Sequence, residues 1–369
     1  MSLIGIANAI LMNIAIIAGM NDPQLKVTPT GFLQMLLEQG ANGQVVNAES
    51  LRSGGDKVMK IRYMQRGLES QVGDVDDCET TVTPAWQEAT IERPMFSKIG
   101  IRIDDSLMRK LETEAVSQVQ PGQPPTPMFY GLYQTMLVKL NGLIQHINSN
   151  LLLAQSTSWG VNAAYGTLDP QALKFGGKMT MDNGIVKLIL DAQMNEIDGE
   201  VVVVGNGIVN AFQIMNGLKT GVDYQGYPSA NFKVYNDFRS ASLWGPNHFG
   251  VFAKGLSAFV DFNKNVGSFS GLRGGSYFFT IPIPVVLAKG TLSALLLDAQ
   301  LKYVDCPETD SGITIADRGL NLLLSKSYGL WNAPIDMFAT GDRLSGFNGS
   351  LHYVGENADA PAVEPPVEP

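Results

Sequence analysis

Residues 126–155 read TPMFYGLYQTMLVKLNGLIQHINSNLLLAQ, the longest helical pattern in the chain. Thr126 and Pro127 suit a helix start, because a threonine side chain caps free backbone amides and proline is favoured at the first helical position. Apolar residues then recur at spacings of three and four, which is typical of one helix face: Phe129, Leu132, Met136, Leu140, Leu143, Ile147 and Leu151. The pattern predicts a helix on the order of 28 residues, or ~40 Å long at 1.5 Å per residue.

The amino-terminal segment predicts a second helix with one apolar face. Its stripe consists of Leu3, Ile6, Ile10, Ile14 and Ile17. No Lys or Arg precedes Lys26, and Asn8 and Asn13 interrupt the apolar run, so a secretory signal is not indicated. The run is also short for a membrane span. We expect a core or partner-docking helix. Because the stripe would be an exposed apolar patch on a monomer, we interpret its five residues as a subunit interface.

A hairpin with an acidic tip is predicted next. Met59, Ile61 and Tyr63 alternate with Lys60 and Arg62, and a polar return runs from residue 80 to 91. Neither strand has enough apolar residues to be buried on both faces, so we expect an arm that projects from the body. Opposite charges on arms of neighbouring copies are expected to meet, which makes interface candidates of two sets: basic Lys57, Lys60, Arg62 and Arg66, and acidic Asp74, Asp76 and Asp77.

The rest of the chain mixes strands and helices, which predicts an α+β fold. Residues 99–103 alternate like a strand, and four prolines between 121 and 127 break regular structure. Helices are expected at 182–196 and 208–218. Strands are expected at 201–204, 249–252, 257–261, 277–281 and 296–304, with a strand-rich segment at 320–353. The acidic, proline-rich end is expected to be a disordered tail.

Composition excludes several functional classes. The chain has 369 residues, 45% of them hydrophobic, which is enough for a sizeable core. A net charge of -9 without clustered Lys and Arg argues against a protein that wraps nucleic acid. Two cysteines far apart, Cys78 and Cys306, do not make a disulfide framework.

No motif makes a positive case for catalysis. EVVVVGNGIVNAFQ at 200–213 resembles the strand, glycine turn and helix of a nucleotide-binding fold, yet an asparagine replaces the third glycine and no acidic ribose ligand follows at the expected distance. The acidic tip lacks the glycine and glutamate of a calcium loop. The three histidines, His146, His248 and His352, stand in no metal or hydrolase motif. We therefore predict no catalytic, cofactor-binding or metal residues, and no cofactor.

The order of segments resembles the major capsid protein of tailed bacteriophages, the Hong Kong 97-type fold also seen in encapsulin shells. The likeness rests on the arm, the projecting hairpin, the long helix, and the stretches SNLLLAQSTSWGVNA (149–163), EVVVVGNGIVNAFQ and HFGVFAKGLSAFVDF (248–262). It implies an N-arm at 1–45, an E-loop at 46–92, a P-domain at 93–174 with its spine helix at 126–155, an A-domain at 175–318, return strands at 319–355 and a tail at 356–369.

The resemblance also implies a function and partners. It implies an icosahedral shell of hexamers and pentamers that encloses double-stranded DNA without sequence-specific binding. It also implies separate scaffolding and portal proteins, possible decoration proteins and no membrane. The chain would be a virion protein that assembles in the host cytoplasm. Some members cross-link an E-loop lysine to an asparagine of a neighbour, for which Lys57 or Lys60 and Asn348 would be the pair, although unlinked shells are the default.

Two alternatives stay open at this point. One is an α/β nucleotide-binding enzyme that uses the Gly-Asn-Gly turn at 205–207. The other is another self-assembling phage part, such as a tail-tube subunit, although those are usually smaller and lack the long helix.

Overall fold

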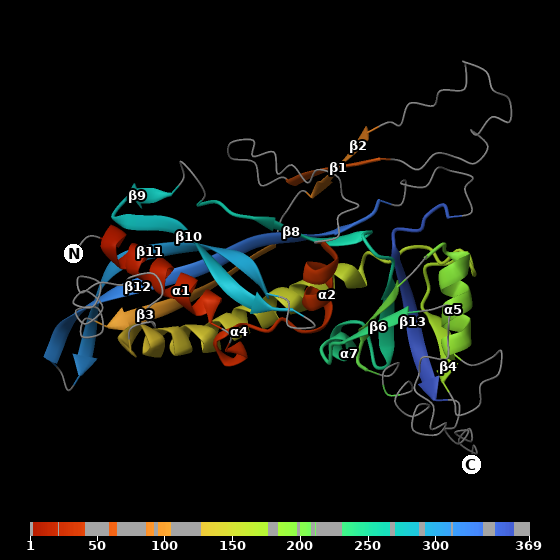
Figure 1. The fold of residues 1–369 in the computed structure, drawn as a ribbon, viewed down its shortest axis with the longest axis horizontal. Helices are drawn as coiled ribbons and strands as arrows, with labels where there is room; N and C mark the ends of the chain where they lie inside the picture. The colour runs from red at the N-terminus through yellow and green to blue at the C-terminus, as the bar shows by residue number, and fades with distance from the viewer. Residues whose placement is uncertain are drawn as a thin grey trace, which may run out of the picture. The chain divides into compact units, whose positions relative to one another are not determined.

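The chain forms helices and sheets in two compact units, which confirms the α+β class (Figure 1). The computed structural model describes residues 3–20, 22–40, 59–64, 86–91, 95–104, 127–175, 184–197, 200–207, 211, 231–265, 270–287, 292–310, 313–334 and 344–357. The first unit comprises residues 1–29, 94–147 and 260–329, and the second comprises residues 30–93, 148–259 and 330–369.

The first unit is built on a six-stranded sheet. Its strands run in the order β3 (Met95–Asp104), β12 (Ile313–Asn332), β11 (Leu292–Asp310), β10 (Ser276–Val286) and β9 (Gly271–Arg273), and β8 (Ser257–Phe262) also pairs with β12. Neighbours along this order are antiparallel. The β11–β12 ribbon is longer than predicted, since its pairing extends from Asp298 opposite Ser325 to Asp310 opposite Ile313.

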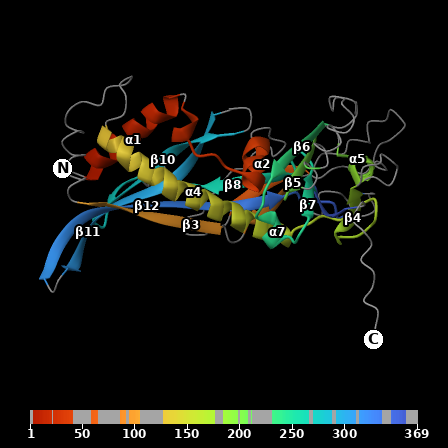
Figure 2. The ribbon, with the colours of Figure 1, turned by 90° about the horizontal axis from the view of Figure 1, so that it is seen from below.

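One face of this sheet carries the core of the first unit. Residues alternate between buried and exposed along β3, as expected for a strand with one covered face. Helices α1 (Leu3–Gly19) and α4 (Pro127–Ser156) supply the covering apolar stripes, and Figure 2 shows α1 and the first part of α4 lying against the sheet. The Tyr133 hydroxyl of α4 donates a hydrogen bond of 2.9 Å to the carbonyl of Leu25, in the short 3-10 helix η1 (Pro23–Leu25). The helix predicted at 126–155 is confirmed by α4, whose two ends each differ from the prediction by one residue.

The second unit contains a mixed five-stranded sheet. The strand order is β4 (Gln171–Phe175), β13 (Ser350–Asn357), β7 (His248–Phe252), β5 (Glu200–Gly205) and β6 (Asn231–Asn236). The outer pairs β4–β13 and β5–β6 are parallel, whereas β7 is antiparallel to both of its neighbours. Residues 201–204 are buried without alternation, which is typical of a strand covered on both faces. Helices α2 (Gly31–Gly40), α5 (Gly184–Met194) and α7 (Ser240–Leu243) belong to this unit.

The core of the second unit joins segments from across its sequence. Apolar residues of α5 pack with those of β4, β5, β7 and β13, and the buried members include Leu173, Phe175, Ile185, Leu188, Val201, Val203, Phe249, Val251, Leu351 and Tyr353. A separate two-stranded antiparallel sheet consists of β1 (Met59–Met64) and β2 (Trp86–Ile91).

The structure divides the chain differently from the predicted segments. Residues 260–318, expected in the A-domain, belong to the first unit because β9, β10 and β11 pair into the same sheet as β3. Helix α2 has no counterpart among the predicted elements. The predicted helix at 208–218 and the tail beyond residue 357 lie outside the described residues, apart from residue 211. None of the helices in the described ranges is long and apolar enough to cross a membrane.

Candidate functional site: assembly surfaces and polar clusters

The β1–β2 hairpin is the first candidate for an assembly surface. Among the described strands, β1 and β2 pair only with each other. Gln87, Glu88 and Thr90 of β2 are exposed, so successive side chains on both faces of this strand reach solvent. An isolated two-stranded sheet is at best marginally stable in water. Among the described strands, the hairpin therefore has no third strand to support it.

The predicted charged candidates fall partly on this hairpin. Lys60 and Arg62 lie on β1, where Lys60 is the register partner of Thr90 and Arg62 that of Glu88. The other five, namely Lys57, Arg66, Asp74, Asp76 and Asp77, lie outside the described residues. Their role in subunit contacts stays a prediction.

The amino-terminal stripe is an internal surface, and the expectation that it is exposed is wrong. Leu3, Ile6, Ile10, Ile14 and Ile17 are all buried, with at most 6% of any of these residues exposed. Helix α1 packs on β10 and β11, so its stripe faces the first unit's own sheet. The periodicity correctly predicted a helix with one apolar face, but periodicity does not show whether the covering surface belongs to the same chain. The outer side of α1 exposes Ile4 and Met12 instead.

The Gly-Asn-Gly turn is explained by packing. Gly207 has a φ of 90°, a left-handed conformation that glycine adopts without the steric cost a side chain would bring. Gly205 does not have the positive φ expected of it. A β-carbon there would instead lie 2.5 Å from the Phe249 Cβ, so glycine is needed for the close approach of β5 and β7. The Gly205 carbonyl accepts a hydrogen bond from the Asp237 amide at 2.6 Å. Backbone conformation therefore explains the glycine at 207, and close packing explains the glycine at 205.

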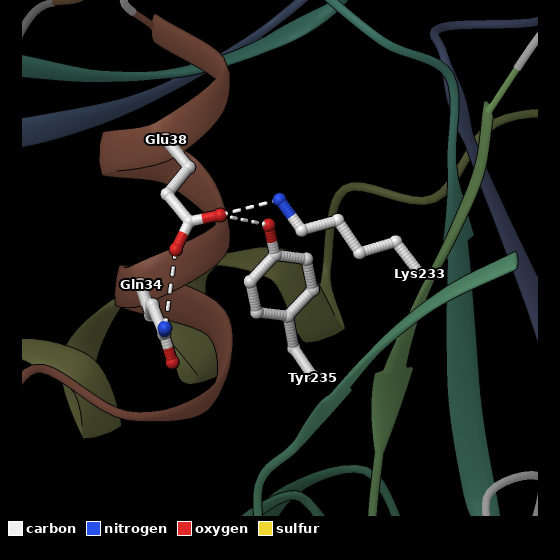
Figure 3. Close-up of polar contacts among 4 residues, drawn as sticks. All are labelled: Gln34, Glu38, Lys233 and Tyr235. Atoms are coloured by element: carbon white, nitrogen blue, oxygen red, sulfur yellow. Dashed lines mark hydrogen bonds and ion pairs between the residues drawn. The ribbon is translucent and has the colours of Figure 1, made fainter. Parts of the chain in front are cut away.

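Helix α2 is held at its carboxyl-terminal end by a charged cluster (Figure 3). One oxygen of the Glu38 carboxylate accepts hydrogen bonds from Lys233 Nζ and from the Tyr235 hydroxyl, both at 2.5 Å. The other oxygen accepts a bond of 3.1 Å from Gln34 Nε2, one turn earlier on the helix. Lys233 and Tyr235 lie on β6, the edge strand of the five-stranded sheet. This Glu38 cluster joins α2 to that edge.

The amino-terminal end of α2 is capped by side chains distant in sequence. Asp237 Oδ2 accepts a hydrogen bond of 3.0 Å from the Phe32 amide, and Asn148 Oδ1 accepts one of 2.8 Å from the Leu33 amide. Asn148 Nδ2 also donates to Asp237 Oδ2 at 2.7 Å. The first amides of a helix have no partners within the helix, so a carboxylate there stabilises it through both hydrogen bonding and the helix dipole.

Two of the three histidines form a pair. His248 Nδ1 and His352 Nε2 are 2.9 Å apart, on adjacent strands β7 and β13. The Trp159 ring stacks on the His352 ring, with centroids 4.4 Å apart and an interplanar angle of 9°. Burial lowers the pKa of His352 to about 4, with a further contribution from the charge of His248, and burial also lowers the pKa of His248. Both rings are therefore neutral near pH 7.

A buried carboxyl group lies at the carboxyl-terminal end of α5. Asp191 is 5% exposed and accepts a hydrogen bond of 3.2 Å from the Tyr353 hydroxyl, which in turn accepts one of 3.1 Å from Asn162 Nδ2. Burial raises the pKa of Asp191, although hydrogen bonds from Tyr353 and Tyr165 and the charge of Lys187 act the other way. This network joins α5 and the loop that contains Asn162 to β13.

Neither the Glu38 cluster nor the Asp191 network was anticipated from the sequence. Glu38 and Lys233 are 195 residues apart, and Asp191 and Tyr353 are 162 apart, so no local spacing connects them. His146 is exposed on α4. Within the described ranges, no group of three or more His, Cys, Asp or Glu side chains is arranged to hold a metal ion.

Comparison with known proteins gives structural similarity only. No protein-family model matches the chain, and no curated protein matches it. Among solved structures, it is similar to the capsid asymmetric unit of cyanophage A-1(L), with 13% identity and a TM-score of 0.43 over 89% of this chain and 93% of that one. It is also similar to the capsid of Ralstonia phage GP4, with 9% identity and a TM-score of 0.38 over 85% and 88%. A third match is the capsid of cyanophage P-SCSP1u, with 10% identity and a TM-score of 0.35 over 83% and 85%. At such TM-scores, a functional assignment has to rest on this chain's own elements.

Proposed function

We propose that this chain is a major capsid protein that self-assembles into an icosahedral shell around the double-stranded DNA of a tailed phage. The observation that carries the proposal is the β1–β2 hairpin, which has no other strand partner in the described part of the chain and exposes both faces of β2. A subunit of this kind gains stability when the hairpin lies on a neighbour. The resemblance in segment order supports the same conclusion.

The proposal extends to partners and location. The shell consists of hexamers and pentamers of this chain, with separate scaffolding and portal proteins and possible decoration proteins. The chain encloses DNA without reading its sequence, which fits a net charge of -9. The protein belongs to the virion and assembles in the host cytoplasm.

The nucleotide-binding alternative has lost its main support. Its only motif was the turn at 205–207, where Gly207 serves backbone conformation and Gly205 serves the approach of β7. Thermal denaturation with adenine, nicotinamide and flavin nucleotides tests it directly. A ligand at 100 times its dissociation constant would stabilise the chain by about 2.7 kcal/mol. A clear rise in melting temperature with any of them would restore the enzyme hypothesis.

Negative-stain electron microscopy of the purified chain tests the capsid proposal. Closed shells are expected, whereas tubes would indicate a tail component and uniform small particles at every concentration would contradict both. A variant with Lys60→Glu and Arg62→Glu on the hairpin should assemble less than wild type. The matched control is Lys139→Glu, a charge reversal on an exposed position of α4.

A further inference from the structure

His248 and His352 lie on one face of the five-stranded sheet, on the neighbouring antiparallel strands β7 and β13. The register sets His352 opposite Gly250, two residues after His248, so the two histidines are diagonal neighbours. Phe249 and Tyr353, which follow them in sequence, are buried in the core with α5. Because successive side chains of a strand point to opposite faces, both histidines lie on the other face of the sheet.

The rings of the two histidines are held in place by their neighbours. Trp159 is stacked on the His352 ring, and a β-carbon at Gly250 would lie 2.9 Å from the Trp159 ring, so glycine leaves room for this stack. A β-carbon at Gly245 would likewise lie 2.7 Å from His248 Cδ2. Packing therefore orients both rings before any ligand binds, as a preorganised site requires.

Both rings can offer a lone pair to the space between them. They are neutral near pH 7, and a neutral imidazole has one N–H and one lone pair, with the proton on either nitrogen. In the hydrogen-bonded pair, one of the facing nitrogens donates and the other accepts. When both protons lie on the outer nitrogens, His248 Nε2 and His352 Nδ1, two lone pairs face each other. A cation can then take the place of the shared hydrogen without any net loss of protons.

The distance between the facing nitrogens fits a single metal ion. Metal–imidazole bonds are about 2.0 Å long, so two nitrogens 2.9 Å apart would both reach one ion and form an angle of about 90° at it. A tetrahedral Zn²⁺ prefers a wider angle, whereas square-planar and tetragonal sites are typical of Cu²⁺ and Ni²⁺. In the described ranges no third His, Cys, Asp or Glu is arranged with this pair, so water would complete the coordination.

We propose that His248 and His352 form a binding site for a divalent transition-metal ion, Cu²⁺ in preference to Ni²⁺. The ion is held by His248 Nδ1 and His352 Nε2. Copper is preferred because nitrogen ligands bind it most tightly among the divalent first-row metals. The site lies within one chain and does not rest on the proposed shell. A bound ion would join β7 to β13 and thereby stabilise the sheet of the second unit.

Copper titration of the purified full-length chain tests this site. Cys78 and Cys306 are replaced by serine in every protein compared, so that thiols neither reduce nor bind the ion. Tryptophan fluorescence should fall as one Cu²⁺ binds per chain, because Trp159 lies against His352 and a bound paramagnetic ion quenches a neighbouring indole. Electron paramagnetic resonance should show coupling of the bound Cu²⁺ to two imidazole nitrogens. The melting temperature should rise with Cu²⁺ or Ni²⁺ but not with Mg²⁺, which prefers oxygen ligands.

Substitution of each histidine identifies the ligands. His248→Gln and His352→Gln should each weaken Cu²⁺ binding more than about tenfold, a loss that even the partners of a ligand can produce. His248→Gln also keeps Trp159 and His352 together, so it separates loss of the ion from loss of packing. His146→Gln, at an exposed position of α4, is the matched control and should leave the affinity unchanged.

Three outcomes would overturn the inference: unchanged affinity in His248→Gln and His352→Gln, an equal loss in His146→Gln, or coupling of the bound ion to fewer than two nitrogens. The histidine pair would then be a structural hydrogen bond only. A chain that forms shells without binding copper would refute the metal site alone. A chain that binds copper through both histidines and never forms shells would refute only the proposed shell.

Discussion

Gly205 ends β5 opposite Phe249 of β7, and a β-carbon at this position would lie 2.5 Å from the Phe249 Cβ. We expect Gly205→Ala to lower the free energy of unfolding by about 1–3 kcal/mol, because an overpacked strand pair has to move apart. Gly142→Ala is the control, since nothing lies within 4 Å of a β-carbon there. In an exposed helix interior it should stabilise by about 0.5–1 kcal/mol. Urea denaturation measures both, and an unchanged Gly205→Ala midpoint would contradict the packing role.

His352 gives the protein a predictable response to acid. Its pKa falls from an ordinary 6.5 to about 4 on folding, mainly through burial. Between these values the unfolded chain binds more protons, so the stability present above pH 6.5 is lost as the pH falls. Glutamine at this position does not titrate. We therefore expect the free energy of unfolding to fall by about 1 kcal/mol less in His352→Gln than in wild type as the pH is lowered, a figure reduced for the partial exposure of the ring.

The measurement is the difference in unfolding free energy between His352→Gln and wild type from about pH 7 to pH 5. The variant should be less stable at pH 7, where it loses the stacked ring, and should approach wild type as the pH falls. Asp191 has a raised pKa and acts in the opposite direction, but it is common to both proteins and cancels in the difference. A difference that does not change with pH would show that the His352 ring titrates normally.

At the scale of elements, α1 serves as part of the first unit's core. Ile10 is 1% exposed and Ile4 is 43% exposed on the same helix. Ile10→Ala should lower the free energy of unfolding by about 2–5 kcal/mol, because it leaves a cavity against the sheet. Ile4→Ala should cost less than about 1 kcal/mol. If the two variants have equal denaturant midpoints, α1 does not pack as described.

Helix α2 depends on the Glu38 cluster for its position on β6. Glu38→Ala removes the acceptor of Lys233 and Tyr235, and a part-buried charged hydrogen bond of this kind is worth about 1–2 kcal/mol. Amide hydrogen exchange should accelerate in α2 and β6 and remain unchanged in β11. Gln193→Ala, an exposed substitution on α5, should change neither. Faster exchange throughout the chain would indicate general destabilisation instead.

The elements that the sequence predicted well are those whose pattern is local. The stripe of α4 and the apolar run of β5 specify helix and strand without reference to distant residues. Strand β10 was predicted too short because Pro282 and Pro284 interrupt its pattern. In the described part of the chain, however, β11 is the one strand that pairs with β10 beyond Phe278. Along the other edge of β10 the described residues add an isolated bridge to Val27, whose amide donates to the Pro284 carbonyl. Prolines, which have no amide hydrogen, are tolerated at such an edge. Helix α2 was missed because its caps, Asp237 and Asn148, come from distant positions.

At the scale of the whole molecule, local patterns did not determine which strands share a sheet. The resemblance implied a single A-domain at 175–318, whereas residues 260–318 belong to the unit whose sheet contains β3. The burial of the α1 stripe could not be predicted from local pattern either. The same periodicity occurs whether an apolar helix face packs on its own chain or on another molecule. The polar clusters were less predictable than the fold, because each joins residues far apart in sequence: Glu38 with Lys233, and Asp191 with Tyr353.

The charge of the whole molecule bears on how its assembly responds to salt. The chain carries -9 overall, and the sequence of β1 contains Lys60 and Arg62. Subunit contacts made by these cations should weaken as salt rises, because the screening length falls from about 10 Å at 0.1 M to about 3 Å at 1 M. Each exposed pair is worth only about 0–1 kcal/mol, but every copy in a shell repeats it. Light scattering should therefore show the concentration needed for assembly rising with added salt, while the urea midpoint of the unassembled chain changes little. Assembly that is unaffected or strengthened by salt would instead indicate contacts dominated by apolar surface.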